Sequence, residues 1–259
     1  MTTLEQPLTA ANTPHGVHLG GTRSLLNNAI IVFGGACSKQ NGMLGATSRT
    51  LRYDVPDAEW SEVETNGDRP CPRYRHGACR TGPEQMAVFG GYLRIPAENN
   101  YAQSRREEML CSSSLFFLHL PSWTWTNPKP SNPPTPRGGH SLTCVGRKLV
   151  ILGGGQYYHN FELPRRYREQ DLALSLDWFD MSTSTYGHAS QVRGIQPDPR
   201  GGHSAILLQP ETMRSSGGLG IIVFAGRDFS DESGRPTHHG RMDAHWLVFG
   251  KGCGSRDDD

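Results

Sequence analysis

The sequence lacks several features that often reveal a function. Its six cysteines include no C-x-x-C pair and none of the close spacings of zinc sites or small disulfide scaffolds. Its 26 lysines and arginines nearly balance 25 acidic residues, so no global field attracts nucleic acid or an anionic membrane. It has no apolar run of about 18 residues that could span a bilayer, and residues 1–16 do not resemble a secretion signal. We therefore expect reduced thiols and a soluble protein of the cytoplasm or the nucleus.

Common catalytic motifs are also missing. The glycine-rich stretch Gly217–Gly220 is not followed by the Gly-Lys-Ser/Thr that completes a phosphate-binding loop, and no G-x-S-x-G nucleophile elbow occurs. We therefore predict no catalytic residue, no metal ligand and no cofactor.

Glycine and proline, by contrast, are abundant. Apolar residues make up only 35% of the chain, whereas 31 glycines and 18 prolines indicate many turns between short elements. This composition favours an all-β fold, and a chain of 259 residues can form a single all-β domain.

Three short sequence motifs, here called words, recur along the chain in a constant order. PRGGHS stands at 136–141 and again at 199–204, with a variant, PRYRHG, at 72–77. The second word is an apolar run that ends in glycine: IIVFGG at 30–35, AVFGG at 87–91, VILGG at 150–154 and VFAG at 223–226. The third is TLRYD at 50–54, LFFLHL at 115–120, LDWFDM at 176–181 and HWLVFG at 245–250. Each short run bounded by glycine or turn residues predicts a strand.

An aromatic residue follows the third word at a fixed distance. Trp60, Trp125 and Tyr186 each stand six residues after a polar position, namely Asp54, His119 and Asp180. With a tight turn between them, this even offset brings the aromatic side chain back beside the preceding strand. The unit is therefore four short antiparallel strands. Copies must stack side by side, because one such sheet cannot bury both faces.

This order of words resembles the kelch repeat, from about Gly20 to Gly250. The resemblance implies a β-propeller of about four blades within residues 1–250. The last unit has no fourth strand of its own, so we expect residues 3–8 to supply it, and we expect residues 251–259 to form a disordered acidic tail. A fragment of a larger propeller is the alternative. The resemblance also implies framework roles for Gly34, Gly35, Asp54, Trp60, Arg73, His76, Gly90, Gly91, Trp125, Arg137, His140, Gly153, Gly154, Asp180, Tyr186, Arg200 and His203. Contact of one or more of these arginines with a ligand is the alternative.

Long polar insertions follow the second strand of every unit, at 36–49, 92–114, 155–173 and 227–241. Antiparallel strands reverse at each turn, so all four should project from one face, together with the proline-rich links between units. Aromatic residues and arginines are enriched at protein interfaces, and the second and third insertions are rich in both. Packing of the third insertion on its own blade is the alternative. The predicted contacts with a protein partner are Arg94, Tyr101, Arg105, Arg106, Tyr157, Tyr158, His159, Phe161, Arg165, Arg166 and Arg168.

Three other functions are weaker alternatives. Kelch-like copper-radical oxidases need tyrosines and histidines near the axis, for which Tyr157, Tyr158, His159, His238 and His239 supply only the residue types. Iron-dependent specifier proteins carry Glu-x-x-x-Asp-x-x-x-His, and here Glu64 and Asp68 are followed by Pro72 instead of histidine. Arg165, Arg166 and Arg168 beside tyrosines could bind single-stranded nucleic acid.

Overall fold

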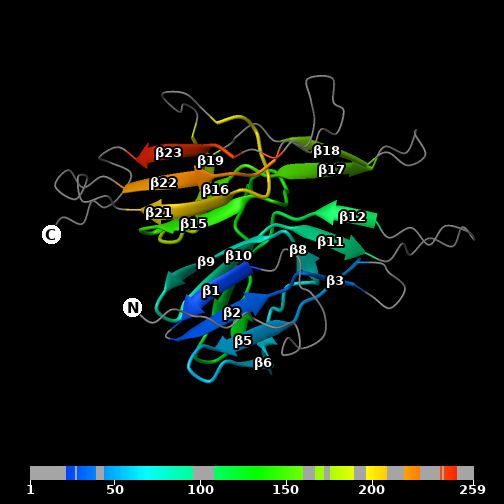
Figure 1. Ribbon diagram of the computed structural model, residues 1–259, viewed down its shortest axis with the longest axis vertical. Helices are drawn as coiled ribbons and strands as arrows, with labels where there is room; N and C mark the ends of the chain where they lie inside the picture. The colour runs from blue at the N-terminus through cyan, green and yellow to red at the C-terminus, as the bar shows by residue number, and fades with distance from the viewer. Residues whose placement is uncertain are drawn as a thin grey trace, which may run out of the picture.

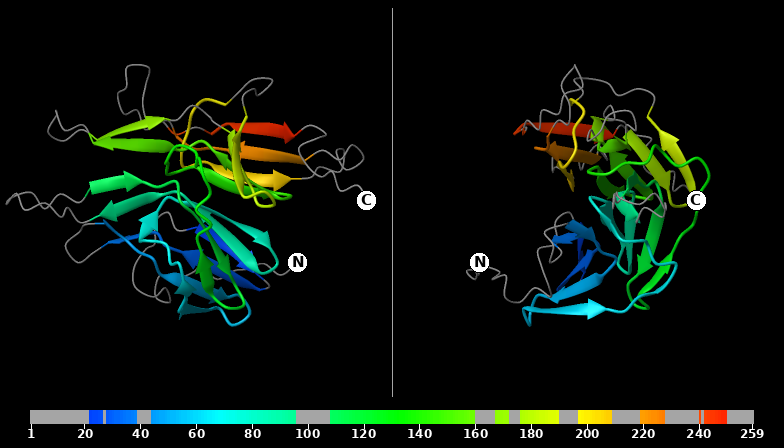
Figure 2. Two further views of the ribbon diagram at one scale, coloured as in Figure 1. Left: turned by 180° about the vertical axis from the view of Figure 1, so that it is seen from behind. Right: turned by 90° about the vertical axis from the view of Figure 1, so that its right-hand side faces the viewer.

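The computed structural model describes residues 22–26, 28–38, 44–95, 108–159, 167–171, 176–189, 197–208, 219–227, 240 and 242–249. These residues form strands, bridges and turns, and no helix long and apolar enough to cross a bilayer occurs among them. The sheets stand side by side in an arc, as the three views show (Figures 1 and 2). The predicted all-β, kelch-type architecture is confirmed.

Four of the sheets, here called blades 1 to 4, follow one another along the arc. Their first strands are neighbours in chain order, β1 beside β9, β9 beside β15 and β15 beside β21. Blade 1 consists of β1 (Thr22–Leu26), β2 (Ala29–Phe33), β5 (Thr50–Asp54) and β6 (Glu59–Val63). Blade 2 contains β9 (Gly77–Gly82), β10 (Gln85–Phe89), β13 (Leu115–His119) and β14 (Thr124–Thr126). Blade 3 contains β15 (Ser141–Val145), β16 (Lys148–Leu152), β19 (Leu176–Asp180) and β20 (Thr185–His188), and blade 4 contains β21 (Ser204–Leu208), β22 (Leu219–Phe224) and β23 (Ala244–Phe249).

The core lies between blades, where the apolar face of one sheet packs on the next. Ile31 and Phe33 of blade 1 pack against Met86, Val88 and Trp125 of blade 2, and the rings of Phe33 and Trp125 are 4.8 Å apart. Similar clusters join blade 2 to blade 3 and blade 3 to blade 4. Each blade therefore depends on its neighbour for burial of its apolar surface.

The aromatic residue of the last strand lies where the spacing predicts. Trp60 pairs with Tyr53, Trp125 with Leu118 and Tyr186 with Phe179, in each case across from the residue before the polar position. The Tyr53 and Trp60 rings are 4.9 Å apart, which is within the range of favourable aromatic pairs.

The insertions contain antiparallel hairpins in addition to loops, which the sequence did not predict. Each leaves from the glycine end of the second strand of its blade. The hairpins are β3 (Ala36–Ser38) with β4 (Leu44–Ala46), β11 (Tyr92–Ile95) with β12 (Glu108–Cys111), and β17 (Gly155–His159) with β18 (Tyr167–Asp171).

The links between blades add two short strands. β7 (Asn66–Gly67) pairs in parallel with β14 at the outer edge of blade 2, and β8 (Arg73–Tyr74) pairs with β11. These pairs attach the link between blades 1 and 2 to the second blade. The proposed closing strand at residues 3–8 and the tail at residues 251–259 lie outside the described residues.

Candidate functional site

The arginines of the repeated word are buried and bonded to backbone carbonyl groups. Arg73, Arg137 and Arg200 are at most 2% exposed. In each, Nε donates to the carbonyl two residues earlier, at 3.0 to 3.1 Å. Nη1 donates to the carbonyl group just after the second strand of the same blade, that of Gly90, Gly153 or Ala225. The arginine thus joins the link between blades to the end of a strand.

The remaining partner of the arginine differs from blade to blade. Arg73 donates to the Ser114 hydroxyl at 3.2 Å and lies 5.0 Å from the centroid of the Phe116 ring. Arg137 forms a buried ion pair with Asp177, with 2.7 Å between Nη2 and Oδ2. A buried guanidinium needs such partners because desolvation, which lowers the pKa of Arg73 to about 10, disfavours its charge.

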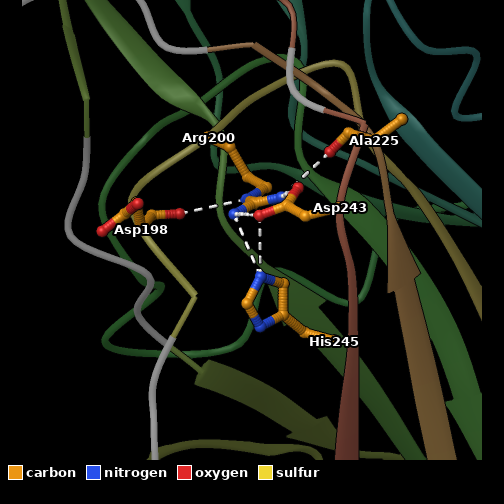
Figure 3. A network of polar contacts seen from close by, with 5 residues as sticks. All are labelled: Asp198, Arg200, Ala225, Asp243 and His245. Carbon is orange, nitrogen blue, oxygen red and sulfur yellow. Dashed lines mark hydrogen bonds and ion pairs between the residues drawn. The ribbon is translucent and has the colours of Figure 1, made fainter.

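Blade 4 surrounds its arginine with a carboxylate and a histidine (Figure 3). Arg200 donates to both carboxylate oxygens of Asp243, at 2.5 and 2.9 Å, and Nε2 of His245 lies 2.8 Å from the same carboxylate. The pKa of Asp243 lies well below its usual range, mainly because Arg200 donates hydrogen bonds to its carboxylate. Asp243 is therefore ionised at neutral pH.

The histidines of the same word lie between neighbouring blades. The backbone N–H of Gly77 donates to Nε2 of His140 at 3.2 Å, and Nε2 of His203 lies 2.9 Å from the Ser141 hydroxyl. His76 packs edge-on against Phe33 of blade 1. Burial lowers the pKa of His76 to about 3 and that of His203 to about 4, and it lowers the pKa of His140 as well. All three imidazoles are therefore neutral at pH 7.

A glycine lets the next blade approach at each of these contacts. Gly90 has φ +67°, and a Cβ there would lie 2.8 Å from both the Arg137 carbonyl oxygen and Cε1 of His140. The neighbouring Gly91 donates its N–H to the same carbonyl at 2.8 Å. The described arginines, histidines and glycines thus form the junctions between blades.

A cavity of about 720 Å³ lies at the inner edge of blades 2, 3 and 4, at the end from which the hairpins leave. We call it the axial cavity. Its walls include the starts of the first strands, the hydroxyl-bearing Ser141 and Ser204, and two arginines, Arg75 and Arg227.

Sequence reasoning missed the axial cavity and Arg75. Arg75, Gly139 and Gly202 hold equivalent places in the three words, with φ of 52°, 73° and 66°. The N–H of Gly139 donates to the Arg75 carbonyl at 2.8 Å, and the N–H of Gly202 donates to the Gly139 carbonyl at 2.7 Å. Two of the words place glycine here, where a left-handed conformation is easy, and one places arginine. The signal in the sequence was the arginine in PRYRHG at the place where PRGGHS has glycine. The framework interpretation treated PRYRHG only as a variant of the same word.

The hairpins form a continuous row beside this cavity. β4 lies next to β11. β12 lies next to β17, as Figure 1 shows. Arg94 lies on β11, Tyr157, Tyr158 and His159 lie on β17, and Arg168 on β18 pairs with Tyr158. We call this row, with the mouth of the axial cavity, the hairpin face. The other predicted contact residues, Tyr101, Arg105, Arg106, Phe161, Arg165 and Arg166, lie outside the described residues.

The residues considered for metal binding do not gather into a site in the described part of the chain. No group of three histidine, cysteine, aspartate or glutamate side chains with suitable geometry occurs there. Glu64 and Asp68 are exposed, and Asp68 accepts a hydrogen bond from the backbone of Asn127 at 3.3 Å. His238 and His239 lie outside the described residues.

The chain is similar to several known proteins over parts of their length. It is 33% identical to human host cell factor 2 over 135 residues, which are 49% of this chain and 16% of that protein. It is 30% identical to dynein regulatory complex subunit 7 of Chlamydomonas reinhardtii over 141 residues, 53% of this chain and 11% of that protein. Among solved structures, that of YjhT matches with a TM-score of 0.56 and 13% identity, covering 83% of this chain and 61% of that one. At this identity the match shows the fold alone.

A family model supplies the assignment. The model of the KLHDC2/KLHL20/DRC7 Kelch-repeats domain matches residues 20–233, which include all four blades up to β22 and the axial cavity up to Arg227. Together with the four-stranded blades and the repeated arginine, histidine and glycine contacts, this match shows that the chain belongs to the kelch-repeat family.

Proposed function

We propose that this chain is a non-catalytic protein-interaction module that binds a protein partner on the hairpin face. The observation that carries the proposal is the side-by-side placement of the second and third hairpins. Residues of the types that anchor interfaces lie on both of them, with Arg94 on β11 and Tyr157 and Tyr158 on β17. Hairpins on a rigid scaffold are well suited to recognition, because little conformational entropy is lost on binding.

The composition of the hairpin face indicates the chemistry of the partner. The axial cavity opens beside the hairpins and is lined by Arg75 and Arg227. Positive charge in a recess favours an acidic segment, because a recess concentrates the field and excludes water. The partner would then place acidic residues over the cavity and apolar or aromatic ones over β17 and β18.

The similarity to a subunit of a complex supports this class of function. The relative from Chlamydomonas reinhardtii is by name a subunit of a dynein regulatory complex. Its matched region corresponds to about half of the present chain, 53%. Assembly with other proteins is therefore a reasonable activity for the kelch repeats of this chain.

Affinity capture with quantitative mass spectrometry tests the proposal. The intact chain is compared with a Tyr157→Ala/Tyr158→Ala variant and with an Arg75→Glu/Arg227→Glu variant. Each is expected to lower recovery of the specific partner at least tenfold, about 1.4 kcal/mol, because interface anchors contribute this much or more.

A matched control lies at the other end of the blades. Val55 is an exposed apolar residue in the turn between β5 and β6, away from the hairpins. Val55→Ala should recover the same partners as the unchanged chain. If both test variants also recover them in equal amounts, the hairpin face is not the docking site.

A further inference from the structure

Blade 4 ends the arc with an apolar sheet face that no other described element covers. Ile206 and Leu208 on β21 are 60% and 41% exposed, and Phe224 on β22 is 46% exposed. The opposite face of the same sheet is buried against blade 3, with Ile221 and Val223 fully inaccessible. Three large exposed apolar side chains on one sheet face are unusual and indicate an interaction site.

Blade 3 has a sheet face equivalent to this exposed face of blade 4, and blade 4 covers it. The pairing of Phe224 with Ser204 matches that of Leu152 with Ser141, so Ile222 and Phe224 correspond to Val150 and Leu152. Val150 and Leu152 are buried in the cluster between blades 3 and 4. The outer face of blade 4 is thus one half of a junction between blades.

Blade 1 carries the other half. Ile30, Val32, Leu51, Tyr53 and Trp60 lie on the face turned away from blade 2. By register they correspond to Met86, Val88, Phe116, Leu118 and Trp125, the blade 2 residues that pack against blade 1 and are buried there. Val32 and Leu51 are buried, whereas Ile30, Tyr53 and Trp60, farther along the same face, keep part of their surface exposed. The two ends of the arc therefore carry complementary faces.

The two ends of the arc differ from the inner junctions at two positions that would meet each other. Blades 1 to 3 have a glycine after the second strand, where a Cβ would lie 2.8 to 2.9 Å from Cε1 of the histidine of the next blade. Blade 4 has Ala225 there, with φ 58°. The pairing of Thr22 with Phe33 corresponds to that of Gly77 with Phe89, so in the sequence Gly21 stands where blade 2 has His76. In the sequence of blade 1, glycine and not histidine thus stands at the position whose ring a Cβ at residue 225 would meet in a following blade.

We propose that the outer face of blade 4 docks on the outer face of blade 1 of a second copy of this chain, head to tail. Blade 1 of the same copy does not cover the face, because Ile206 remains 60% exposed. The contact repeats a junction that the chain already makes three times, so its chemistry is established within the molecule. Such a heterologous contact closes into a ring of copies or extends into a chain. It lies on the sides of the terminal blades and does not depend on the proposed function of the hairpin face.

Sedimentation equilibrium of the intact chain and of two single variants tests this contact. The unchanged chain should show a concentration-dependent mass of twice the chain or a higher multiple. Ile206→Asp disrupts only the blade 4 face and Tyr53→Asp only the blade 1 face, so each variant alone should be monomeric. Leu110→Asp is the matched control, because Leu110 is 45% exposed but lies on β12, away from both faces. This control should associate like the unchanged chain, and far-UV circular dichroism checks that each variant is folded.

Mixing the two monomeric variants gives the decisive result. One intact blade 4 face and one intact blade 1 face are then present, so a one-to-one dimer should reappear. An unchanged chain that stays monomeric at all concentrations overturns the proposal. Loss of stability on Ile206→Asp in a monomeric chain would show closure within one copy and would equally overturn it. Dimers that survive Tyr53→Asp would show that blade 4 pairs with itself, and they too would overturn the proposal.

Discussion

Substitution of Gly90 by alanine tests the junction between blades 2 and 3 most directly. Gly90 has φ +67°, and an L-residue in this conformation costs about 1 kcal/mol. The added Cβ would also lie 2.8 Å from the Arg137 carbonyl oxygen and from the buried His140 ring. Neither group can move without disturbing the packing, and forced overpacking costs about 1 to 3 kcal/mol more. We therefore expect the free energy of unfolding to fall by about 2 to 4 kcal/mol.

Two glycines of the same chain separate these contributions. Gly146 has φ +57°, but a Cβ there meets nothing within 4 Å, so Gly146→Ala should cost only the backbone strain of about 1 kcal/mol. Gly82 has neither constraint, and Gly82→Ala should stabilise the chain by about 0.4 to 1 kcal/mol through the unfolded state.

Equilibrium unfolding in urea, followed by tryptophan fluorescence, measures all three variants. The expected order of stability is Gly82→Ala, then Gly146→Ala, then Gly90→Ala. If Gly90→Ala costs no more than Gly146→Ala, the close approach of blade 3 to blade 2 does not exist in solution, and the account of the junction is wrong.

Three further predictions concern buried charge, pH and thiol reactivity. Asp177→Ala should lower the free energy of unfolding by about 3 to 5 kcal/mol in urea titrations, because it removes the carboxylate partner of the buried Arg137. A second change of Arg137 to methionine should recover part of the loss, and strictly additive effects would contradict this. The pKa of His203, about 4 when folded against 6.5 when unfolded, should make stability full above pH 6.5 and lower it by about 1.4 kcal/mol per pH unit down to about pH 4 in urea titrations. His76 and His140 add to this slope, and a slope of zero would refute the prediction. Iodoacetamide should modify the exposed Cys71 before Cys79, whose thiol pKa is raised by burial, as peptide mass mapping can show; the reverse order would contradict the burial.

The sequence by itself determined the repeating unit. A strand needs only local signals, namely a short apolar run, a terminal glycine and a turn, and all of these lie within a few residues of one another. The word TLRYD coincides with β5, and AVFGG contains the end of β10 followed by its two glycines. The six-residue offset also predicted the pairing of Trp125 beside the preceding strand, because tight turns fix strand register.

Only the tertiary structure decided what those repeats contact. The three arginines stand in the same word but have a hydroxyl and a ring, a carboxylate, or a carboxylate with a histidine as partners, supplied by residues up to 45 positions away. The placement of Arg75 at the axial cavity and the exposure of Ile206 at the end of the arc likewise depend on which blades are neighbours. Local patterns specify backbone conformation, whereas burial and pairing depend on packing between segments distant in the chain.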